Sequence, residues 1–410
     1  MVEKHAVTRQ LHKQYKSATK REKGAILDTL CTLSGYSRDH AARLLRAGPP
    51  SKKPARRRKR KRIYDADVLF ALRRVWATLD GLCGKRLAAA MPHVLPSMER
   101  HGELMIDRVV REKLLSVSAA TIDRMLAPDR ARLALKGRAG TKPGTLLKAH
   151  IPIRTFAEWD DARAGFVEID LVAHEGGSPH GEFCQTLDVT CVATGWTETR
   201  AVRNKAQVHV FAALEHIIGA LPFPVRGIDS DNGAEFINKH LLRYCKERKI
   251  TFTRSRAYRK NDNCFVEQKN WSVVRRNVGY ARFDTFEELA CLNELYEVLR
   301  EHTNFFMPSS KLLSKTREGS KVTKRYDEPK TPYARALISP DVSDAAKRRL
   351  TAHYETLNPV ALKRDIVRLQ KRLYELVALK ESVRRREVQA LELDDIYDES
   401  TNDVFDDILT

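Results

Sequence analysis

Apolar and polar positions follow strand and helix periods in turn from residue 165 to about residue 303, which predicts an α/β unit. In GFVEIDLVAH the apolar residues alternate with Glu168 and Asp170, so this segment is predicted as a strand with Asp170 near its middle. Two strands, a helix, a strand, a helix, a strand and a helix are expected to follow. They are predicted at 183–194, at 196–202, at 204–221, from 225, from 235, at 250–255 and from about 262.

Three acidic residues lie on separate elements of this unit. Asp170 is on the first strand, and Asp231 follows the fourth strand. Asn232 and Gly233 come next, and both tolerate positive φ, so they predict a turn at which the backbone can approach a ligand. Glu267 lies in the first two turns of the last helix. One such acid alone is usually a turn or cap residue, but the ordered set of three predicts a shared site.

The segments EID at Asp170, SDNGAEF at Asp231 and NDNCFVEQKN at Glu267 resemble the retroviral-integrase-like catalytic core of DDE transposases, which has an RNase H-like fold. The resemblance covers residues 165 to about 303 firmly. Flanking segments such as GWTETRAVRNKAQ and NWSVVRRNVGY look like the same group of bacterial insertion-sequence proteins. The resemblance implies that the protein hydrolyses DNA to release a 3′-OH at each end of an insertion sequence. It also implies that each end is then transferred into target DNA, without ATP and without a covalent protein intermediate.

The resemblance implies that Asp170, Asp231 and Glu267 are the catalytic residues and the ligands of two Mg²⁺ ions, for which Mn²⁺ can substitute. Two metal ions can hold the attacking and leaving oxygens in line, and Mg²⁺ prefers carboxylates and water. Three converging carboxylates also repel one another unless a cation lies between them. We expect Asp170 to bridge both ions, with Asp231 on one ion and Glu267 on the other.

Neighbouring residues are assigned supporting roles. Asn232 and Gly233 shape the turn, and Asn263, four residues before Glu267, shares its helix face and is placed to orient the carboxylate or a metal-bound water. Family members often carry Lys or Arg seven residues after the Glu, where this chain has Val274. The DNA-contacting cations are therefore sought among Lys269, Arg275 and Arg276.

Four other residues have two readings each. Asp229 is the main rival of Asp231, although the turn follows Asp231. Asp188 either points at the site or occupies an exposed strand position. His174 is predicted to be a surface residue rather than a ligand, and Trp196 a packing residue rather than a recognition residue.

The charge of the chain indicates a polyanionic partner, either nucleic acid or an anionic membrane surface. Its 410 residues allow two or three domains, and the formal net charge is +21. No apolar run approaches the length of a membrane span, and the start lacks the apolar core of an export signal, so neither fate is expected. The seven cysteines form no C-x-x-C pair, which fits free thiols in a reducing cytosol.

Residues 1–48 predict a helix-turn-helix, with a glycine turn near Gly35 and Ser37 as cap of the second helix. The side chains expected to face DNA are Arg38, His40, Arg43 and Arg46. An ordinary helical hairpin remains the alternative. Residues 49–63 are a basic arm predicted to contact DNA phosphates rather than only to solubilise the chain. Its contact residues are Arg56, Arg57, Arg58, Lys59, Arg60, Lys61 and Arg62.

Residues 64–127 predict a second helical domain with a helix-turn-helix capped by Ser118, and 128–160 a linker into the core at 161–305. Residues 306–358 are a basic region that is either a DNA contact or a connector. Residues 359–388 carry a heptad pattern typical of a short coiled coil between protomers or of an intramolecular amphipathic helix. The acidic tail, 389–410, is expected to be disordered.

The chain is thus predicted to be multidomain: an all-α helix-turn-helix N-terminal region, an α/β RNase H-like core with a mixed five-stranded sheet and helices, and a small basic and helical C-terminal region. The leading hypothesis is a cytoplasmic, nucleoid-associated bacterial DNA transposase. Its expected partners are double-stranded DNA, as terminal inverted repeats and target, and a second copy of the chain, at least as a dimer. The alternatives are a non-catalytic DNA-binding regulator that retains the core, and a nuclease acting on RNA–DNA hybrids.

Overall fold

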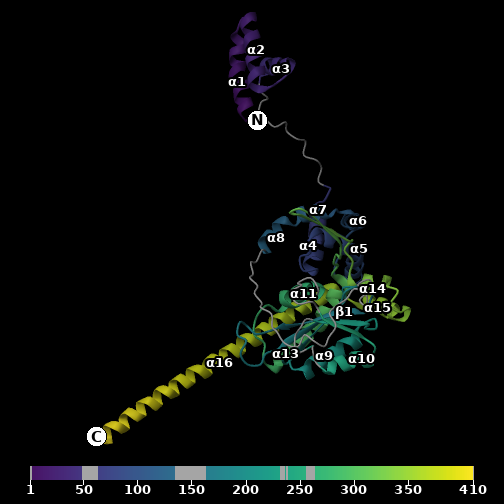
Figure 1. The fold of residues 1–410 in the computed structure, drawn as a ribbon, viewed down its shortest axis with the longest axis vertical. Coiled ribbons are helices and arrows are strands. Elements are labelled where there is room, and N and C mark those ends of the chain that lie inside the picture. Colours follow the sequence, from purple (N-terminus) through teal and green to yellow (C-terminus); the bar gives the residue numbers. More distant parts are fainter. Residues whose placement is uncertain are drawn as a thin grey trace. The chain divides into compact units, whose positions relative to one another are not determined.

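The computed structural model describes residues 2–48, 63–133, 163–230, 236, 239–254 and 264–409. The chain divides into two compact units, residues 1–63 and residues 64–410. The described part of the first unit consists of three helices, shown in purple in Figure 1. They are α1 (Val2–Ser17), α2 (Lys20–Ser34) and α3 (Arg38–Ala47).

Helices α2 and α3 form where the sequence predicted them. Gly35, at φ 68°, ends α2 in the left-handed region, and the Ser37 side chain caps α3 by accepting from the backbone N–H of His40. Leu30 and Leu45 are fully buried between the helices. We did not predict α1, which packs on the same small core. The use of α3 to read DNA stays a prediction.

The second unit begins with five helices. They are α4 (Ala66–Thr78), α5 (Gly84–Arg100), α6 (Arg108–Ser116), α7 (Ala119–Met125) and α8 (Ala127–Leu133). Ser118 caps α7 as predicted, accepting from the backbone N–H of Thr121. Helix α5 continues through Pro92 and Pro96. Each proline removes one helical hydrogen bond and crowds the carbonyl four residues earlier, and the buried side chains of α5, such as Met91 and Leu95, offset this cost.

These helices are joined to the rest of the second unit by buried contacts. His302 Nε2 lies 2.8 Å from the carbonyl oxygen of Thr78, and Ser97 Oγ donates to the carbonyl of Leu357 at 2.8 Å. One hydrophobic cluster includes residues of α4 to α7 and of the sheet. The helical region predicted as a separate domain, residues 64–127, therefore shares its hydrophobic core with the sheet. Helix α8 falls almost entirely in residues 128–160, which were predicted as a linker.

A mixed five-stranded sheet lies at the centre of this unit, as predicted, in the order β3-β2-β1-β4-β5. Its strands are β1 (Phe166–Ala173), β2 (Gln185–Cys191), β3 (Thr197–Val202), β4 (Gly227–Ser230) and β5 (Thr251–Arg254). β1, β2 and β3 pair antiparallel, whereas β4 and β5 run parallel to β1. In the parallel half, β4 ends at Ser230 and β5 at Arg254.

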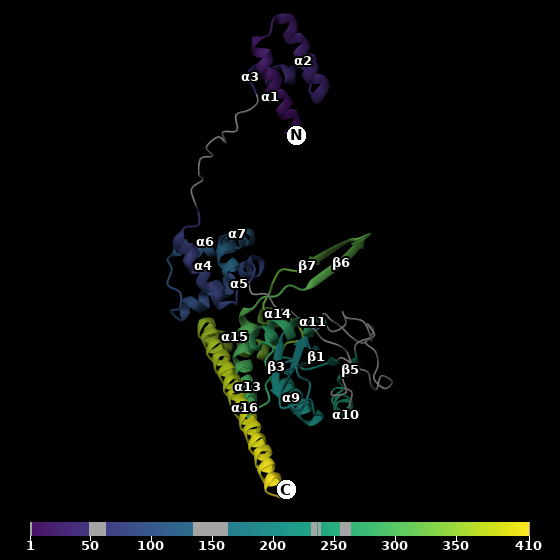
Figure 2. The same ribbon diagram turned by 90° about the vertical axis from the view of Figure 1, so that its left-hand side faces the viewer.

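Helices cover both faces of the sheet (Figures 1 and 2). Those after the third strand are α9 (Gln207–Ala220), α10 (Lys239–Glu247), α11 (Cys264–Lys269), the π-helix η1 (Asn270–Arg275), α12 (Arg276–Val278), α13 (Phe286–Glu301) and the π-helix η2 (His302–Phe306). Val167 and Ile169 share a buried cluster with α9, whereas Val172 shares one with α13. Because strand residues alternate between faces, Glu168 and Asp170 lie on the α13 face with Val172.

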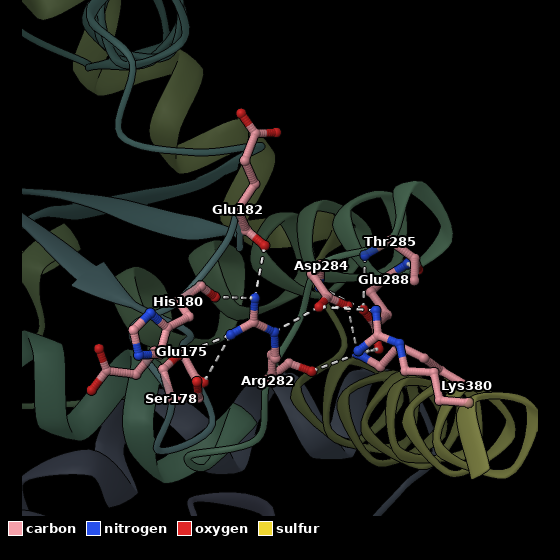
Figure 3. Close-up of polar contacts among 10 residues, drawn as sticks. Glu175, Ser178, His180, Glu182, Arg282, Asp284, Thr285, Glu288 and Lys380 are labelled. Carbon is pink, nitrogen blue, oxygen red and sulfur yellow. Dashed lines mark hydrogen bonds and ion pairs between the residues drawn. The ribbon is translucent and has the colours of Figure 1, made fainter. Parts of the chain in front are cut away.

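Arg282 fixes the connection between β1 and β2, as Figure 3 shows. Its guanidinium donates to the carbonyls of Ser178, His180 and Glu182 and, through Nε, to Asp284 Oδ2 at 2.6 Å. The Lys380 ammonium, on the last helix, donates to Asp284 and to the carbonyl of Arg282. The loop after β1, the start of α13 and the last helix are therefore held as one structure.

The C-terminal region contains a hairpin and three helices. They are β6 (Leu312–Glu318), β7 (Lys321–Tyr326), α14 (Pro332–Ile338), α15 (Asp344–Thr356) and α16 (Pro359–Leu409). The hairpin lies within the segment predicted as a basic region, residues 306–358. All six residues of β7 are exposed, and Figure 2 shows the two strands extending from the body of the unit.

Helix α16 packs within its own chain. Ile366, Leu369 and Leu373 are buried in one cluster with Leu292 and Leu295 of α13, so the heptad pattern describes an intramolecular amphipathic helix at this point. The expectation of a disordered tail from residue 389 was wrong, because α16 continues to Leu409. The tail contains Ala, Leu and Glu, which extend an existing helix at low cost. No helix in the described ranges is long and apolar enough to cross a membrane.

Candidate active site

Asp170 lies in the middle of β1, half-buried, on the sheet face that α11 and η1 cover. Its Oδ2 accepts a hydrogen bond from the Asn270 side chain at 2.6 Å, and its Oδ1 accepts from the backbone N–H of Leu171 at 2.8 Å. Asn270 is three residues after Glu267, at the first position of η1. The bond therefore ties Asp170 to the helix that carries Glu267.

Glu168 makes a second link between the same two elements. Its buried carboxylate accepts hydrogen bonds from the backbone N–H groups of Phe265 (2.9 Å) and Val266 (3.1 Å). These are the second and third residues of α11, which begins at Cys264. A carboxylate at this position satisfies unpaired donors of the helix start and complements the helix dipole. We call the two links, Glu168 to α11 and Asn270 to Asp170, the β1–α11 clasp. It holds Glu267, which is exposed, beside the strand that carries Asp170.

Asp231 lies outside the described residues, as do Asn232, Gly233 and Asn263. The strand that leads to Asp231 is described. Ser230, the last residue of β4, is the Cα partner of Ile169, the residue before Asp170, in a parallel pair. The chain therefore leaves β4 next to the position of Asp170.

Asp188 was not assigned to the site, but it is the direct Cα partner of Asp170 across β1 and β2. It is fully buried, and its Oδ1 accepts from Thr190 Oγ1 at 2.9 Å. Burial raises the pKa of Asp188 to about 8; the Thr190 bond and the Lys269 charge oppose this shift, and Asp170 adds to it. The exposed-strand reading of Asp188 was therefore wrong.

We expect Asp188 to make stability fall as pH rises. The folded protein keeps this carboxyl protonated between about pH 4 and about pH 8, a range in which the unfolded chain has released the proton. Substituting Asp188→Asn removes this contribution, so its unfolding free energy should fall less than that of the wild type over the same range. Urea unfolding at a series of pH values tests this, with the exposed Asp344→Asn as control. Parallel curves for wild type and Asp188→Asn would contradict it.

The rival and neighbouring residues have structural partners. Asp229 is fully buried within β4 and accepts from Thr253 Oγ1 on β5. The prediction that His174 is a surface residue was wrong: it is buried, and its Nε2 bonds to Thr186 Oγ1 at 2.7 Å. The alternation of β1 places it on the covered face of the sheet, and burial lowers its pKa to about 3. Trp196 is buried, which confirms its packing role.

The cations after Glu267 are largely engaged within the chain. Arg275 donates to the carbonyl of Ala173 at 2.6 Å, and Arg276 donates to the carbonyl of Asp80. Lys269 is half-buried, and desolvation lowers its pKa to about 8, against the opposing effect of Asp188. Val274 is fully buried, because it packs into the cluster of α13 and α16. A DNA contact by any of these cations stays a prediction.

The N-terminal candidates are partly exposed. Arg43 and Arg46 are exposed on α3, Arg38 pairs with Asp28, and the His40 ring meets Tyr36 edge-on at 4.8 Å. The basic arm with residues 56–62 lies outside the described residues. DNA contact by either group stays a prediction.

The donor set suits a hard divalent cation. Asp170 and Glu267 supply carboxylate oxygens from facing elements, and oxygen ligands of this kind bind Mg²⁺. Within the described ranges, no three acidic, His or Cys side chains are close enough to hold a metal ion. A third protein ligand would therefore come from outside the described ranges, where Asp231 lies.

Comparison with known proteins places this site in a wider context. Residues 160–260 match the family described as integrase core domain. The chain is 44% identical over 324 residues to the uncharacterized protein y4rM of Sinorhizobium fredii, covering 78% of this chain and 91% of that protein. The integrase core domain indicates a nucleotidyl-transfer enzyme with a role in DNA recombination.

Solved structures show weaker likeness. The catalytic core domain of BIV integrase is 16% identical at a TM-score of 0.27, with 42% of this chain and 91% of that chain covered. The catalytic core domain of HTLV-2 integrase, in complex with magnesium in a dimeric form, is 12% identical at a TM-score of 0.28, with 37% and 93% covered.

Proposed function

This chain belongs to the same protein family as y4rM of Sinorhizobium fredii and contains an integrase core domain, and on this premise we propose that it is a DNA transposase of a bacterial insertion sequence. It binds the terminal inverted repeats of the element, hydrolyses DNA to release 3′-OH ends, and transfers those ends into target DNA. At least two copies act together, since two ends must be joined. The observation that carries this proposal is the β1–α11 clasp.

The clasp supports an active site assembled from distant parts of the chain. It holds the Asp170 strand and the Glu267 helix together through contacts across 97 and 100 residues. Ser230, the residue before Asp231, pairs with Ile169, the residue before Asp170, which supports our assignment of Asp231 to the same site. We assign Asp170, Asp231 and Glu267 as the catalytic and metal-binding residues, with Asn232, Gly233 and Asn263 in support.

The three carboxylates would hold two Mg²⁺ ions, or Mn²⁺ in their place, which supply charge neutralisation at the phosphate and activation of the attacking oxygen. The protein's own contribution is positioning. Glu168 fixes the start of α11, and Asn270 orients the Asp170 carboxylate through Oδ2. Asp188 lies beside Asp170, and burial favours the neutral form of the Asp188 carboxyl. Asp188 therefore adds little negative charge to the group of carboxylates that would hold the metal ions.

The experiment that tests the function uses oligonucleotides carrying the inverted repeats that flank the coding region. The purified protein is expected to nick them at the repeat end and to join that end to a second DNA only when Mg²⁺ or Mn²⁺ is present. Tight binding of the repeats without nicking under either ion would instead support a DNA-binding regulator. Cleavage of RNA–DNA hybrids without joining would support a nuclease.

We expect the β6–β7 hairpin to contribute to DNA affinity. Replacing Lys321, Lys324 and Arg325 together by Gln removes exposed cations from β7, and each lost phosphate contact should reduce the slope of log K against log salt by about 0.9. Fluorescence anisotropy with labelled duplex at several salt concentrations measures this slope.

The matched control replaces Lys347, Arg348 and Arg349 of α15 by Gln, which changes the net charge equally. An equal loss of slope in both triple variants would show a general charge effect and would contradict a specific contact by the hairpin.

A further inference from the structure

Trp271 is exposed in a way that the other described tryptophans are not. Trp76 and Trp196 are 6% and 1% exposed, and their indole N–H groups donate to the Leu82 carbonyl and to Glu198. Trp271 is 60% exposed. No ring contact or hydrogen bond of its indole is found within the described ranges. Leaving so large an apolar surface in water is unfavourable, so the ring is available for a ligand.

The position of Trp271 is set by the β1–α11 clasp. It follows Asn270, whose side chain holds Asp170 at 2.6 Å. It also lies four residues after Glu267, which places the two side chains on one side of the helix. The exposed ring is therefore at the same surface as the exposed Glu267.

The wide turns of η1 separate Trp271 from the residues that pack inward. Within this π-helix, Val273 and Val274 are buried while Trp271 is exposed. π-Helical turns are rare and often mark functional sites. Val274, seven residues after Glu267, is thereby used for packing. The exposed position of this helix next to Glu267 is occupied by the aromatic ring of Trp271.

We propose that Trp271 stacks on the base of an unpaired nucleotide at a DNA end held in the active site. This inference rests on the proposed function, because it takes DNA as the substrate. A flat ring beside acids that act on a phosphate fits the base of a neighbouring nucleotide, and stacking accepts any base. The exposed residues nearest to Trp271 along this helix, Gln268 and Arg276, are polar, whereas a protein-binding tryptophan is usually surrounded by apolar contacts.

The test measures binding, without catalysis, of a duplex whose unpaired 3′ end carries 2-aminopurine. The full chain is used with Ca²⁺ in place of Mg²⁺, and the paired duplex of the same sequence is measured beside it. Trp271→Ala should weaken binding of the unpaired-end probe roughly 5- to 150-fold and remove the quenching of 2-aminopurine. Trp271→Phe should restore part of both, and the paired duplex should bind equally well to all three proteins.

Phe286→Ala is the matched control, because Phe286 is an aromatic residue of α13 with 68% exposure. It should bind both probes like the wild type. Unchanged binding by Trp271→Ala, or an equal loss on both probes, would overturn the proposal. A loss of dimer in sedimentation experiments with Trp271→Ala would also overturn it and assign the ring to a contact between protein chains. Failure of the proposed function would appear separately, as repeat-end DNA that the wild-type protein binds but neither nicks nor joins with Mg²⁺ or Mn²⁺.

Discussion

Replacing Glu267 by Gln is expected to reduce metal-dependent nicking and joining of repeat-end DNA by roughly a thousandfold or more. The substitution keeps the size of the side chain and removes the negative charge that binds the cation. Asp170→Asn should have an effect at least as large, because Asp170 is assigned to both ions. Single-turnover assays on labelled oligonucleotides measure both variants against the wild type.

Glu287→Gln is the control for this prediction. Glu287 is an exposed glutamate in the first turn of α13, and the variant makes the same chemical change away from the acids. It should nick and join at the wild-type rate. Nicking that persists in Glu267→Gln at more than a few per cent of the wild-type rate would refute the assignment of Glu267, provided that the variant still binds DNA.

Substituting Glu168→Ala is expected to loosen the clasp and to lower the unfolding free energy by about 3 kcal/mol. The variant loses two hydrogen bonds to a charged acceptor, at 2.9 and 3.1 Å, and leaves buried N–H groups at the start of α11 without that partner. Because α11 carries Glu267, we also expect a higher Mg²⁺ concentration at half-maximal joining. Urea unfolding measures the first effect and a Mg²⁺ titration the second.

Glu168→Gln separates positioning from simple loss of stability. The amide oxygen can still accept one N–H, so this variant should recover part of the unfolding free energy and part of the Mg²⁺ dependence. If Glu168→Ala lowers stability but leaves the Mg²⁺ concentration at half-maximal joining unchanged, Glu168 has a structural role only.

Local patterns predicted the sheet and the elements that carry the acids. The alternation of apolar and polar residues in GFVEIDLVAH predicted β1 with Asp170 near its middle. This alternation is regular because one face of β1 packs on α9, so every second residue there must be apolar. The helix starts at Ser37 and Ser118 were predicted from the capping preference of serine, which depends on residues within one turn. Signals of this range can be seen in a single sequence.

Contacts between distant residues were not predicted. Glu168 was assigned no role, because its partner helix starts almost a hundred residues later in the chain. His174 was misjudged and Asp188 was left between two readings, because the sequence does not indicate that both faces of β1 and β2 are covered. The π-turns of η1 have no period that a helix pattern would detect, so the outward position of Trp271 emerged only from the structure.

The most direct test of the central claim is a crystal structure of the protein with Mn²⁺, whose anomalous scattering locates each ion. We predict manganese bound by carboxylate oxygens of Asp170 together with Asp231 and Glu267, with Glu168 still bonded to the start of α11. Manganese bound only elsewhere, or the three carboxylates remaining apart when the ion is present, would contradict the account.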